Sequence, residues 1–432
     1  MTKEDAWLNI AIMKLKLILL WICALNFIGP IKGQNNLRDL LQQVSVKHDL
    51  MGGSLVIFND EKILAEGYYG RSDYRRRIAT NSRTIYRVAS ISKMITAIAM
   101  MQLIEKNVCS LDKDVSQILG YSVQNPSYPH NPITVRMLLS HTSGITDSKS
   151  YSQFISSTTN EKSIPNLYEI LNKEGIYYSD LTYSPDKPGT YFQYSNINYV
   201  IVATIIEKIT RERFDHYCKK NIFNILDLKA SFNPQAIKNV NNVAVLYRKK
   251  DGQWLPQTDN FKGKRPNLQN LSGYIAGINA GRLGPQGSLR SSAKDIAKIM
   301  ISLNKNPQKQ SKVLLRKSTV DTMYSSQWIE QDSNGNNYNG LFRNWGLGIH
   351  RLTGKPNADI ALPNSRLMLG HCGEAYGLIS AAYYDPERKL GFVFITNGVG
   401  QSLMQSNKSA FYTVEKDVFD AVENYFASSL RK

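Results

Sequence analysis

Runs of apolar and β-branched residues occur in two regions that lie far apart in the chain. Residues 53–59 (GSLVIFN) and 62–69 (KILAEGYY) flank Asp60-Glu61, and this pattern predicts an antiparallel hairpin. Late in the chain the pattern predicts three further strands, at 345–351, 377–384 and 390–396, with a turn at 385–388.

Helical spacing of apolar residues dominates elsewhere. It is strongest over residues 90–106 (SISKMITAIAMMQLIEK), recurs over 196–209, and predicts a closing amphipathic helix over 411–430. Residues 106–285 outside these helices are rich in Asn, Ser, Pro and Tyr and show only short helical patterns. We therefore expect an inserted, mainly helical lobe with long loops.

Together these elements predict an α/β (α+β) fold. Its antiparallel, five-stranded-type sheet is built from both ends of the chain, is flanked by helices and carries the helical lobe as an insert at about 106–285. No internal repeat and no linker divides the chain, so residues 34–430 are expected to form one domain.

The first 33 residues resemble an export signal. Lys14 and Lys16 precede the apolar run 17–29 (LILLWICALNFIG), which is short for a membrane span. Met13 is an alternative start that would make this signal more compact. We expect export and a mature chain that begins near Gln34, and the alternative is a single uncleaved membrane anchor.

Composition and charge exclude few classes of protein. The 432 residues carry a net charge of +18, yet the densest basic clusters, 75–77 and 262–265, contain no interleaved aromatic residues. We predict a solvated basic surface and no nucleic-acid partner, with an anionic surface as the alternative. The oligomeric state is left open.

Cysteine and histidine usage argues against a disulfide framework and a metal centre. Without Cys23 in the signal, the odd set Cys109, Cys218 and Cys372 remains. The six histidines show no His-x-x-x-His pairing, and no Cys-x-x-Cys occurs. We therefore predict no metal and no cofactor.

A Ser-x-x-Lys pattern places a hydroxyl and an amine on one face of a helix, where the lysine can accept the proton as the oxygen attacks a carbonyl. Four copies occur, at Ser90/Lys93, Ser110/Lys113, Ser291/Lys294 and Ser429/Lys432. Ser90 alone begins the strongest helix, where backbone N–H groups favour a developing anion. For Ser90 the structural alternative is an N-cap serine.

Two further motifs supply polar groups in a suitable order. Tyr194-Ser195-Asn196 offers a phenol for proton relay and an amide for the substrate, or alternatively a buried tyrosine and a helix cap. His371-Cys372-Gly373 precedes two strands, where the glycine would let substrate approach the backbone closely.

Taken together, these motifs resemble the serine β-lactamase and penicillin-binding superfamily, in its class C β-lactamase, D-Ala-D-Ala carboxypeptidase and family VIII esterase branch. Residues 134–144 (TVRMLLSHTSG) and 287–295 (GSLRSSAKD) also resemble stretches of that branch, and the likeness extends over about residues 50–400.

The resemblance implies acylation of Ser90 and proton shuttling by Lys93 and Tyr194. It also implies that Asn196, His371 and Gly373 position the substrate, and that the backbone N–H groups of Ser90 and Glu374 form the oxyanion hole. The implied substrate is a β-lactam, a D-amino-acid peptide or a short ester. Motifs do not separate these classes, and a catalytically silent penicillin-binding-like receptor is the alternative function.

His371 departs from the lysine that is frequent in this third motif. An unperturbed imidazole loses its charge between about pH 6 and 8. If His371 held a substrate carboxylate, efficiency toward carboxylate substrates would fall relative to esters over that range. The alternative is that His371 only makes hydrogen bonds at the strand edge.

Overall fold

A computed structural model describes residues 32–160, 164–266, 271, 273–305 and 313–429. Most of the predicted export signal lies outside these ranges, so export remains a prediction. Among the described helices, none has the length and apolar character needed to cross a membrane.

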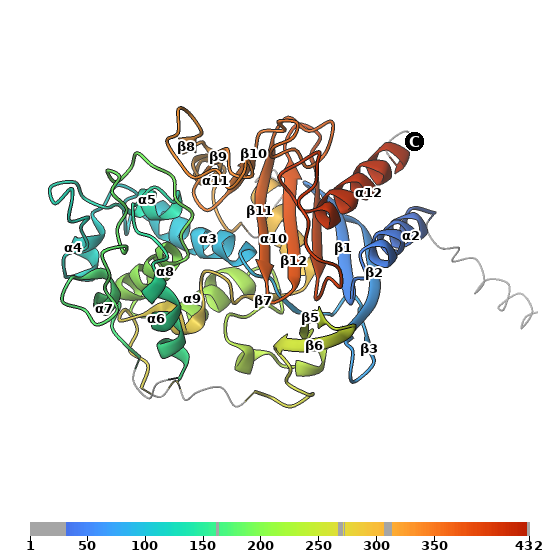
Figure 1. Ribbon diagram of the computed structural model, residues 1–432, viewed down its shortest axis with the longest axis horizontal. Coiled ribbons are helices and arrows are strands. Elements are labelled where there is room, and N and C mark those ends of the chain that lie inside the picture. The colour runs from blue at the N-terminus through green and yellow to red at the C-terminus, as the bar shows by residue number, and fades with distance from the viewer. Residues whose placement is uncertain (1–31, 161–163, 267–270, 272, 306–312, 430–432) are drawn as a thin grey trace, which may run out of the picture.

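An antiparallel sheet forms the centre of the molecule (Figure 1). Its order over the described residues is β3-β2-β1-β13-β12-β11-β10-β9-β8. The strands are β1 (Gly52–Asn59), β2 (Ile63–Asp73), β3 (Ile78–Ala79), β8 (Trp328–Ile329), β9 (Asn344–Trp345), β10 (His350–Leu352), β11 (Met368–Ala375), β12 (Leu378–Asp385) and β13 (Leu390–Thr396).

The two ends of the sequence meet in this sheet, as predicted. Strand β1 pairs with β13 from Gly53 opposite Thr396 to Asn59 opposite Leu390. The five long strands β2, β1, β13, β12 and β11 form its core, and four short strands extend it at the edges. The predicted α/β class with a five-stranded-type sheet is therefore confirmed.

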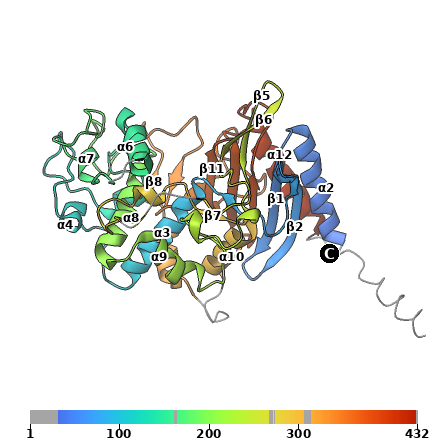
Figure 2. The same ribbon diagram turned by 90° about the horizontal axis from the view of Figure 1, so that it is seen from below.

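The sheet is covered on both faces, which explains why β12 and β13 are buried at every position. Along β1, Leu55 and Ile57 face the packed pair α2 (Lys32–Lys47) and α12 (Thr413–Ser429). Val56 and Phe58 belong to the core on the opposite face, which contains α3 (Ile91–Glu105) and α10 (Ala293–Asn304). Figure 2 shows α2 and α12 on the outer side of the sheet.

A mainly helical lobe lies beside the β11 end of the sheet (Figure 1). Its buried α8 packs against α3, so the lobe and the sheet share one hydrophobic core. The remaining helices are α4 (Val115–Leu119), α5 (Val135–Leu139), α6 (Lys149–Asn160), α7 (Tyr168–Leu171), α8 (Ile197–Thr210), α9 (Phe214–Cys218) and α11 (Lys317–Tyr324), with short η1 (Lys219–Phe223), η2 (Pro234–Ala236), η3 (Val240–Asn242) and η4 (Ala280–Leu283).

Several local expectations were incomplete. The insert contains a hairpin, β5 (Leu246–Lys250) and β6 (Gln253–Thr258), that pairs outside the main sheet, and β4 (Tyr86–Arg87) pairs with β7 (Arg290–Ser291).

The strand expected at 345–351 is instead two short strands, because Gly348 adopts a positive φ of 71° and a turn separates β9 from β10. His371-Cys372-Gly373, expected to lead into the strands, lies within a strand of its own, β11.

Candidate active site

Ser90 lies at the start of α3, after Ala89, whose φ of 48° places a non-glycine residue in the left-handed region. Although Ser90 occupies the N-cap position, its side chain accepts no capping hydrogen bond. The hydroxyl oxygen instead lies 3.0 Å from Lys93 Nζ. The geometry therefore favours the nucleophile over the helix-cap alternative.

Lys93 is completely buried, and fixed acceptors surround its amine. Nζ donates to Asn196 Oδ1 at 2.7 Å and to the Gln286 carbonyl at 2.8 Å. These two bonds use both hydrogens of a neutral amine, which leaves its lone pair for the Ser90 hydroxyl. Burial lowers the pKa of Lys93 to about 7, although the Asp147 carboxylate opposes this change. With this pKa, about half of the Lys93 amine is the free base at neutral pH.

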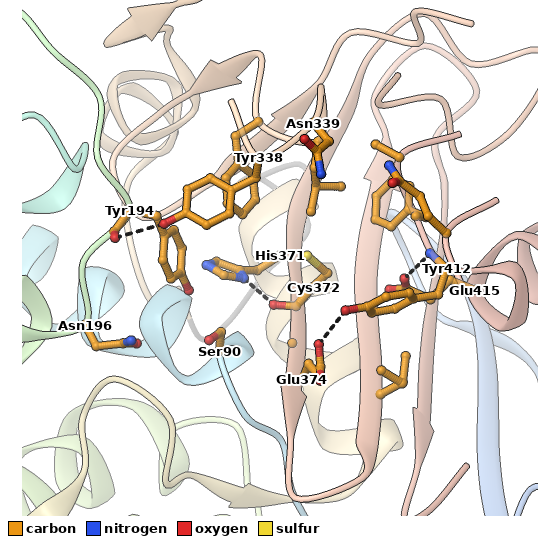
Figure 3. Close-up of a pocket in the computed structure, with 17 residues that line it drawn as sticks. Ser90, Tyr194, Asn196, Tyr338, Asn339, His371, Cys372, Glu374, Tyr412 and Glu415 are labelled. Carbon is orange, nitrogen blue, oxygen red and sulfur yellow. Dashed lines mark hydrogen bonds between the residues drawn. The ribbon is translucent and has the colours of Figure 1, made fainter. Parts of the chain in front are cut away.

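Tyr194 packs beside this pair and faces Ser90 (Figure 3). Its ring centroid lies 4.8 Å from Lys93 Nζ. Burial raises the pKa of Tyr194 well above its ordinary value, although the nearby Ser90 hydroxyl partly offsets this effect. The phenol therefore keeps its proton and is suited to donate it, while Lys93 accepts.

Asn196 precedes α8, and Asp147 holds its amide in place. Asp147 accepts hydrogen bonds from Asn196 Nδ2 at 2.7 Å and from the backbone N–H groups of Asn196 and Ile197 at 2.9 and 3.0 Å. Asn196 makes no side-chain cap of its own. Asp147 thus caps α8 and turns Asn196 Oδ1 toward Lys93.

Sequence reasoning missed Asp147, as well as the supporting role of His141. His141 Nδ1 accepts from the Ser195 N–H at 3.1 Å, and its ring centroid lies 4.4 Å from that of Tyr194. Asp147 closely follows the segment 134–144, whose resemblance was noted. The only signal in the sequence was a carboxylate near segment 134–144. The helix that Asp147 caps, α8, begins 50 residues further along the chain, so no local pattern links the two.

His371 is buried in β11 and contacts Tyr194 and Trp345 through its ring. Its Nδ1 lies 2.5 Å from the Cys372 carbonyl oxygen, which only accepts, so Nδ1 carries the proton. Burial, and then the Lys93 amine, lower the pKa of His371 well below its usual range. The direction of this shift favours a neutral imidazole between pH 6 and 8, which argues against the loss of charge expected over that range.

Gly373 brings β11 against the nucleophile. A Cβ at this position would lie 2.8 Å from the Ser90 nitrogen and 3.0 Å from the Ala89 Cβ, so only glycine fits without a shift. Within the described part of the chain, the Ser90 N–H has no hydrogen-bond acceptor. Its use as an oxyanion-hole donor, together with the Glu374 N–H, remains a prediction.

Ser90, Tyr194, Asn196, His371 and Gly373 line one pocket of about 490 Å³ (Figure 3). We call the side formed by Ser90, Tyr194 and Asn196 the helical wall, and we include Lys93 and Asp147, which hydrogen-bond to these residues but do not line the pocket themselves. The strand wall consists of residues 371–374 of β11, with Tyr412 and Glu415 from the beginning of α12. The pocket is also lined by Tyr338, Asn339, Leu341, Phe342, Ile379, Gln405, Ala410 and Phe411.

The other Ser-x-x-Lys copies lack this environment. Ser291 lies in β7 and its hydroxyl donates to the Ser292 carbonyl, while Lys294 forms a salt bridge with Glu66 at 2.7 Å. Ser110 is exposed in the loop after α3 and accepts from the Asp112 N–H. The fourth copy ends at Lys432, outside the described residues.

Over the described residues, the thiols and the possible metal ligands form no further reactive site. Cys109, Cys218 and Cys372 are free thiols. A search of the described residues finds no group of three His, Cys, Asp or Glu side chains arranged to hold a metal ion.

The fold and the pocket define the class: a sheet built from both ends of the chain, a helical lobe, and a Ser-Lys pair at the start of the buried helix between them. The model of the Beta-lactamase family matches residues 37–411, and the chain belongs to this family. It is thus a member of the serine β-lactamase and penicillin-binding superfamily.

Curated relatives match over part of their length. Protein flp of Staphylococcus aureus (strain MRSA252) is 30% identical over 189 residues, which cover 42% of this chain and 36% of that protein. Penicillin-binding protein 4* of Bacillus subtilis (strain 168) is 28% identical over 211 residues, which cover 48% of this chain and 42% of that protein. The chain therefore aligns with less than half of either relative.

Solved structures share the fold at low identity. An octameric penicillin-binding protein homologue from Pyrococcus abyssi has a TM-score of 0.62 at 23% identity, over 85% of this chain and 74% of its own. The hydrolase EstCE1 has a TM-score of 0.64 at 19% identity, over 90% and 99%. D-amino acid amidase from Ochrobactrum anthropi SV3 has a TM-score of 0.62 at 18% identity, over 92% and 99%.

Proposed function

We propose that this protein is a serine hydrolase that cleaves an ester or amide bond through an acyl-enzyme on Ser90. The observation that carries the proposal is the 3.0 Å approach of Lys93 Nζ to Ser90 Oγ, with both remaining amine hydrogens directed to fixed acceptors. A buried amine with a pKa of about 7 can accept the serine proton near neutral pH.

In the proposed reaction, Ser90 Oγ attacks the carbonyl carbon and its proton moves to Lys93 Nζ. The carbonyl oxygen becomes an oxyanion held by the N–H groups of Ser90 and Glu374. When the bond to the leaving group breaks, the Tyr194 phenol protonates the departing nitrogen or oxygen and regains a proton from Lys93. Water then attacks the acyl-enzyme by the reverse transfers and releases the acid.

Covalent labelling tests this assignment. A fluorophosphonate probe should label the wild-type protein and fail to label Ser90→Ala, because the Lys93 amine lies beside the Ser90 hydroxyl. The control variants Ser110→Ala, Ser291→Ala and Ser429→Ala should label normally. Labelling that persists in Ser90→Ala would remove this serine from the mechanism, and an unlabelled wild type would favour a silent receptor.

The substrate class is the finer part of the proposal. Candidates are a D-Ala-D-Ala peptide, a β-lactam and a short ester, because specificity in such a pocket depends on the loops that line it. Incubation with a labelled penicillin, a chromogenic cephalosporin, a short p-nitrophenyl ester and a D-Ala-D-Ala peptide, followed by mass spectrometry of the Ser90 peptide, would identify which of them acylates the enzyme.

A further inference from the structure

The strand wall carries two carboxylates at the end of the pocket away from Asn196 (Figure 3). Glu374 lies at the exposed mouth and accepts a hydrogen bond from the Tyr412 hydroxyl at 2.9 Å. Glu415 is only 5% exposed and accepts from the Tyr412 backbone N–H at 3.0 Å. Tyr412 therefore links a surface carboxylate to a buried one.

Among the described residues, no lysine or arginine lines this end of the pocket. Over the described ranges, neither Glu374 nor Glu415 forms a salt bridge with lysine or arginine. Arg248 and Lys249 line a neighbouring groove that also touches Glu374, but Lys249 pairs there with Asp49. The pocket itself is lined by two glutamates and by no lysine or arginine.

His371, another polar side chain of the strand wall, is also a hydrogen-bond acceptor. With its proton on Nδ1, the neutral His371 presents a bare Nε2, and this buried atom has no hydrogen-bond partner among the described residues. A substrate carboxylate brings only further acceptors, and it would meet negative charge at Glu374. A group with N–H donors and positive charge complements this wall.

We propose that the end of the pocket formed by Glu374, Tyr412 and Glu415 binds a cationic nitrogen of the substrate. The inference rests on the proposed hydrolase function and deepens it: the preferred substrates are amino-bearing esters or amides, and substrates with a free carboxylate are poor. His371 accordingly does not hold a carboxylate.

The raised pKa of Glu415 agrees with this assignment. Burial, and then the charge of Glu374, raise the pKa of Glu415 to about 8, although the Tyr412 N–H opposes them. Among the described residues, no basic group counteracts this increase in the pKa of Glu415. A bound ammonium group would supply the missing positive charge and favour the ionised carboxylate.

Two matched substrate series test the inference, one for each side of the scissile bond. Charge on the leaving group is varied with acetylthiocholine, S-(3,3-dimethylbutyl) thioacetate and 3-(acetylthio)propanoate. Charge on the acyl group is varied with the D-alanyl, propanoyl and 3-carboxypropanoyl p-nitroanilides. Glu415→Gln and Glu374→Gln keep the shape and the acceptor oxygen of each side chain, and Glu387→Gln in the exposed β12–β13 turn is the control.

In at least one series, kcat/KM should fall from the cationic to the neutral to the anionic substrate, by about 100-fold overall. Glu415→Gln should reduce that span by about tenfold, Glu374→Gln by less, and Glu387→Gln not at all. An anionic or neutral substrate that is best in both series, or a span between the cationic and anionic substrates that Glu415→Gln leaves unchanged, would overturn the inference.

Failure of the hydrolase proposal would look different. In that case no substrate is turned over and Ser90 is not labelled by a fluorophosphonate. The subsite is then decided by thermal shifts with choline, 3,3-dimethylbutanol and 3-hydroxypropanoate. A shift produced by choline alone and lost in Glu415→Gln supports the cation site without catalysis, and its absence refutes the site.

Discussion

The two walls of the pocket differ in how far the protein satisfies its own polar groups. On the helical wall, Lys93, Asn196 and Asp147 are joined by hydrogen bonds of 2.7 Å, and no substrate is needed to hold them. On the strand wall, the buried His371 Nε2 has no hydrogen-bond partner and Glu415 forms no salt bridge with lysine or arginine among the described residues. We infer that the helical wall is preorganised for proton transfer and that the strand wall selects the substrate.

The largest expected effect comes from removing the proton path on the helical wall. Lys93→Ala and Tyr194→Phe should each lower kcat by about 10²-fold or more, the scale of a lost general acid or base. Turnover of the best ester, with circular dichroism to confirm folding, measures this. Near-normal turnover in a folded variant would separate that residue from the chemistry.

The pH dependence of kcat/KM also tests the helical wall. Because Lys93 must be the free base and its pKa is about 7, kcat/KM should fall by about tenfold per unit as the pH drops below that value. Tyr194 and His371 should add no further change between pH 6 and 8, since burial keeps both neutral there. An acid limb near the ordinary lysine pKa would contradict a buried, neutral base.

Asp147 should have a smaller and more specific effect. Asp147→Asn removes the charge that raises the pKa of Lys93 and loosens the orientation of the Asn196 amide. We expect kcat to fall by about tenfold and the acid limb to move to lower pH. Asp180→Asn, at an exposed position of the helical lobe, is the matched control. A lower kcat without a displaced limb would indicate a merely structural role.

The smallest effect concerns stability on the strand wall. Folding raises the pKa of Glu415 from 4.5 to about 8, so the stability that this carboxyl contributes is lost as pH rises through that range. Glu415→Gln lacks this loss, and its Tm relative to the wild type should rise by roughly 2–4 °C between pH 6 and 9.

Glu207, whose pKa burial raises to about 7, adds a similar loss to both proteins and cancels in this comparison. Differential scanning calorimetry of the wild type, of Glu415→Gln and of the control Glu387→Gln measures how the Tm difference changes with pH. A Tm difference that is independent of pH would show that folding does not raise the pKa of Glu415.

Sequence patterns predicted the parts of the molecule that depend on local spacing. Strands β1, β2, β12 and β13 and helices α3, α8 and α12 all appear within a few residues of the expected bounds, because apolar period and helical spacing are local properties. Ser90 and Lys93 lie together for the same reason, one helical turn apart.

Residues brought together only by tertiary structure could not be found this way. Asp147 reaches Asn196 from a loop 49 residues earlier in the chain, and Tyr412 reaches Glu374 from 38 residues later. Neither contact has a period or a spacing that a single sequence reveals. The substrate-selecting wall was accordingly the part that sequence reasoning described least.

The pairing of β1 with β13 also constrains how the chain can fold. The hydrogen bond from Thr396 Oγ1 to the Gly52 carbonyl joins residues 344 positions apart, so during synthesis the first hairpin must wait for most of the polypeptide before its neighbour exists. Loops of that length close slowly, and an unpaired strand edge is prone to intermolecular association meanwhile. We expect refolding to be slow and its yield to fall as protein concentration rises.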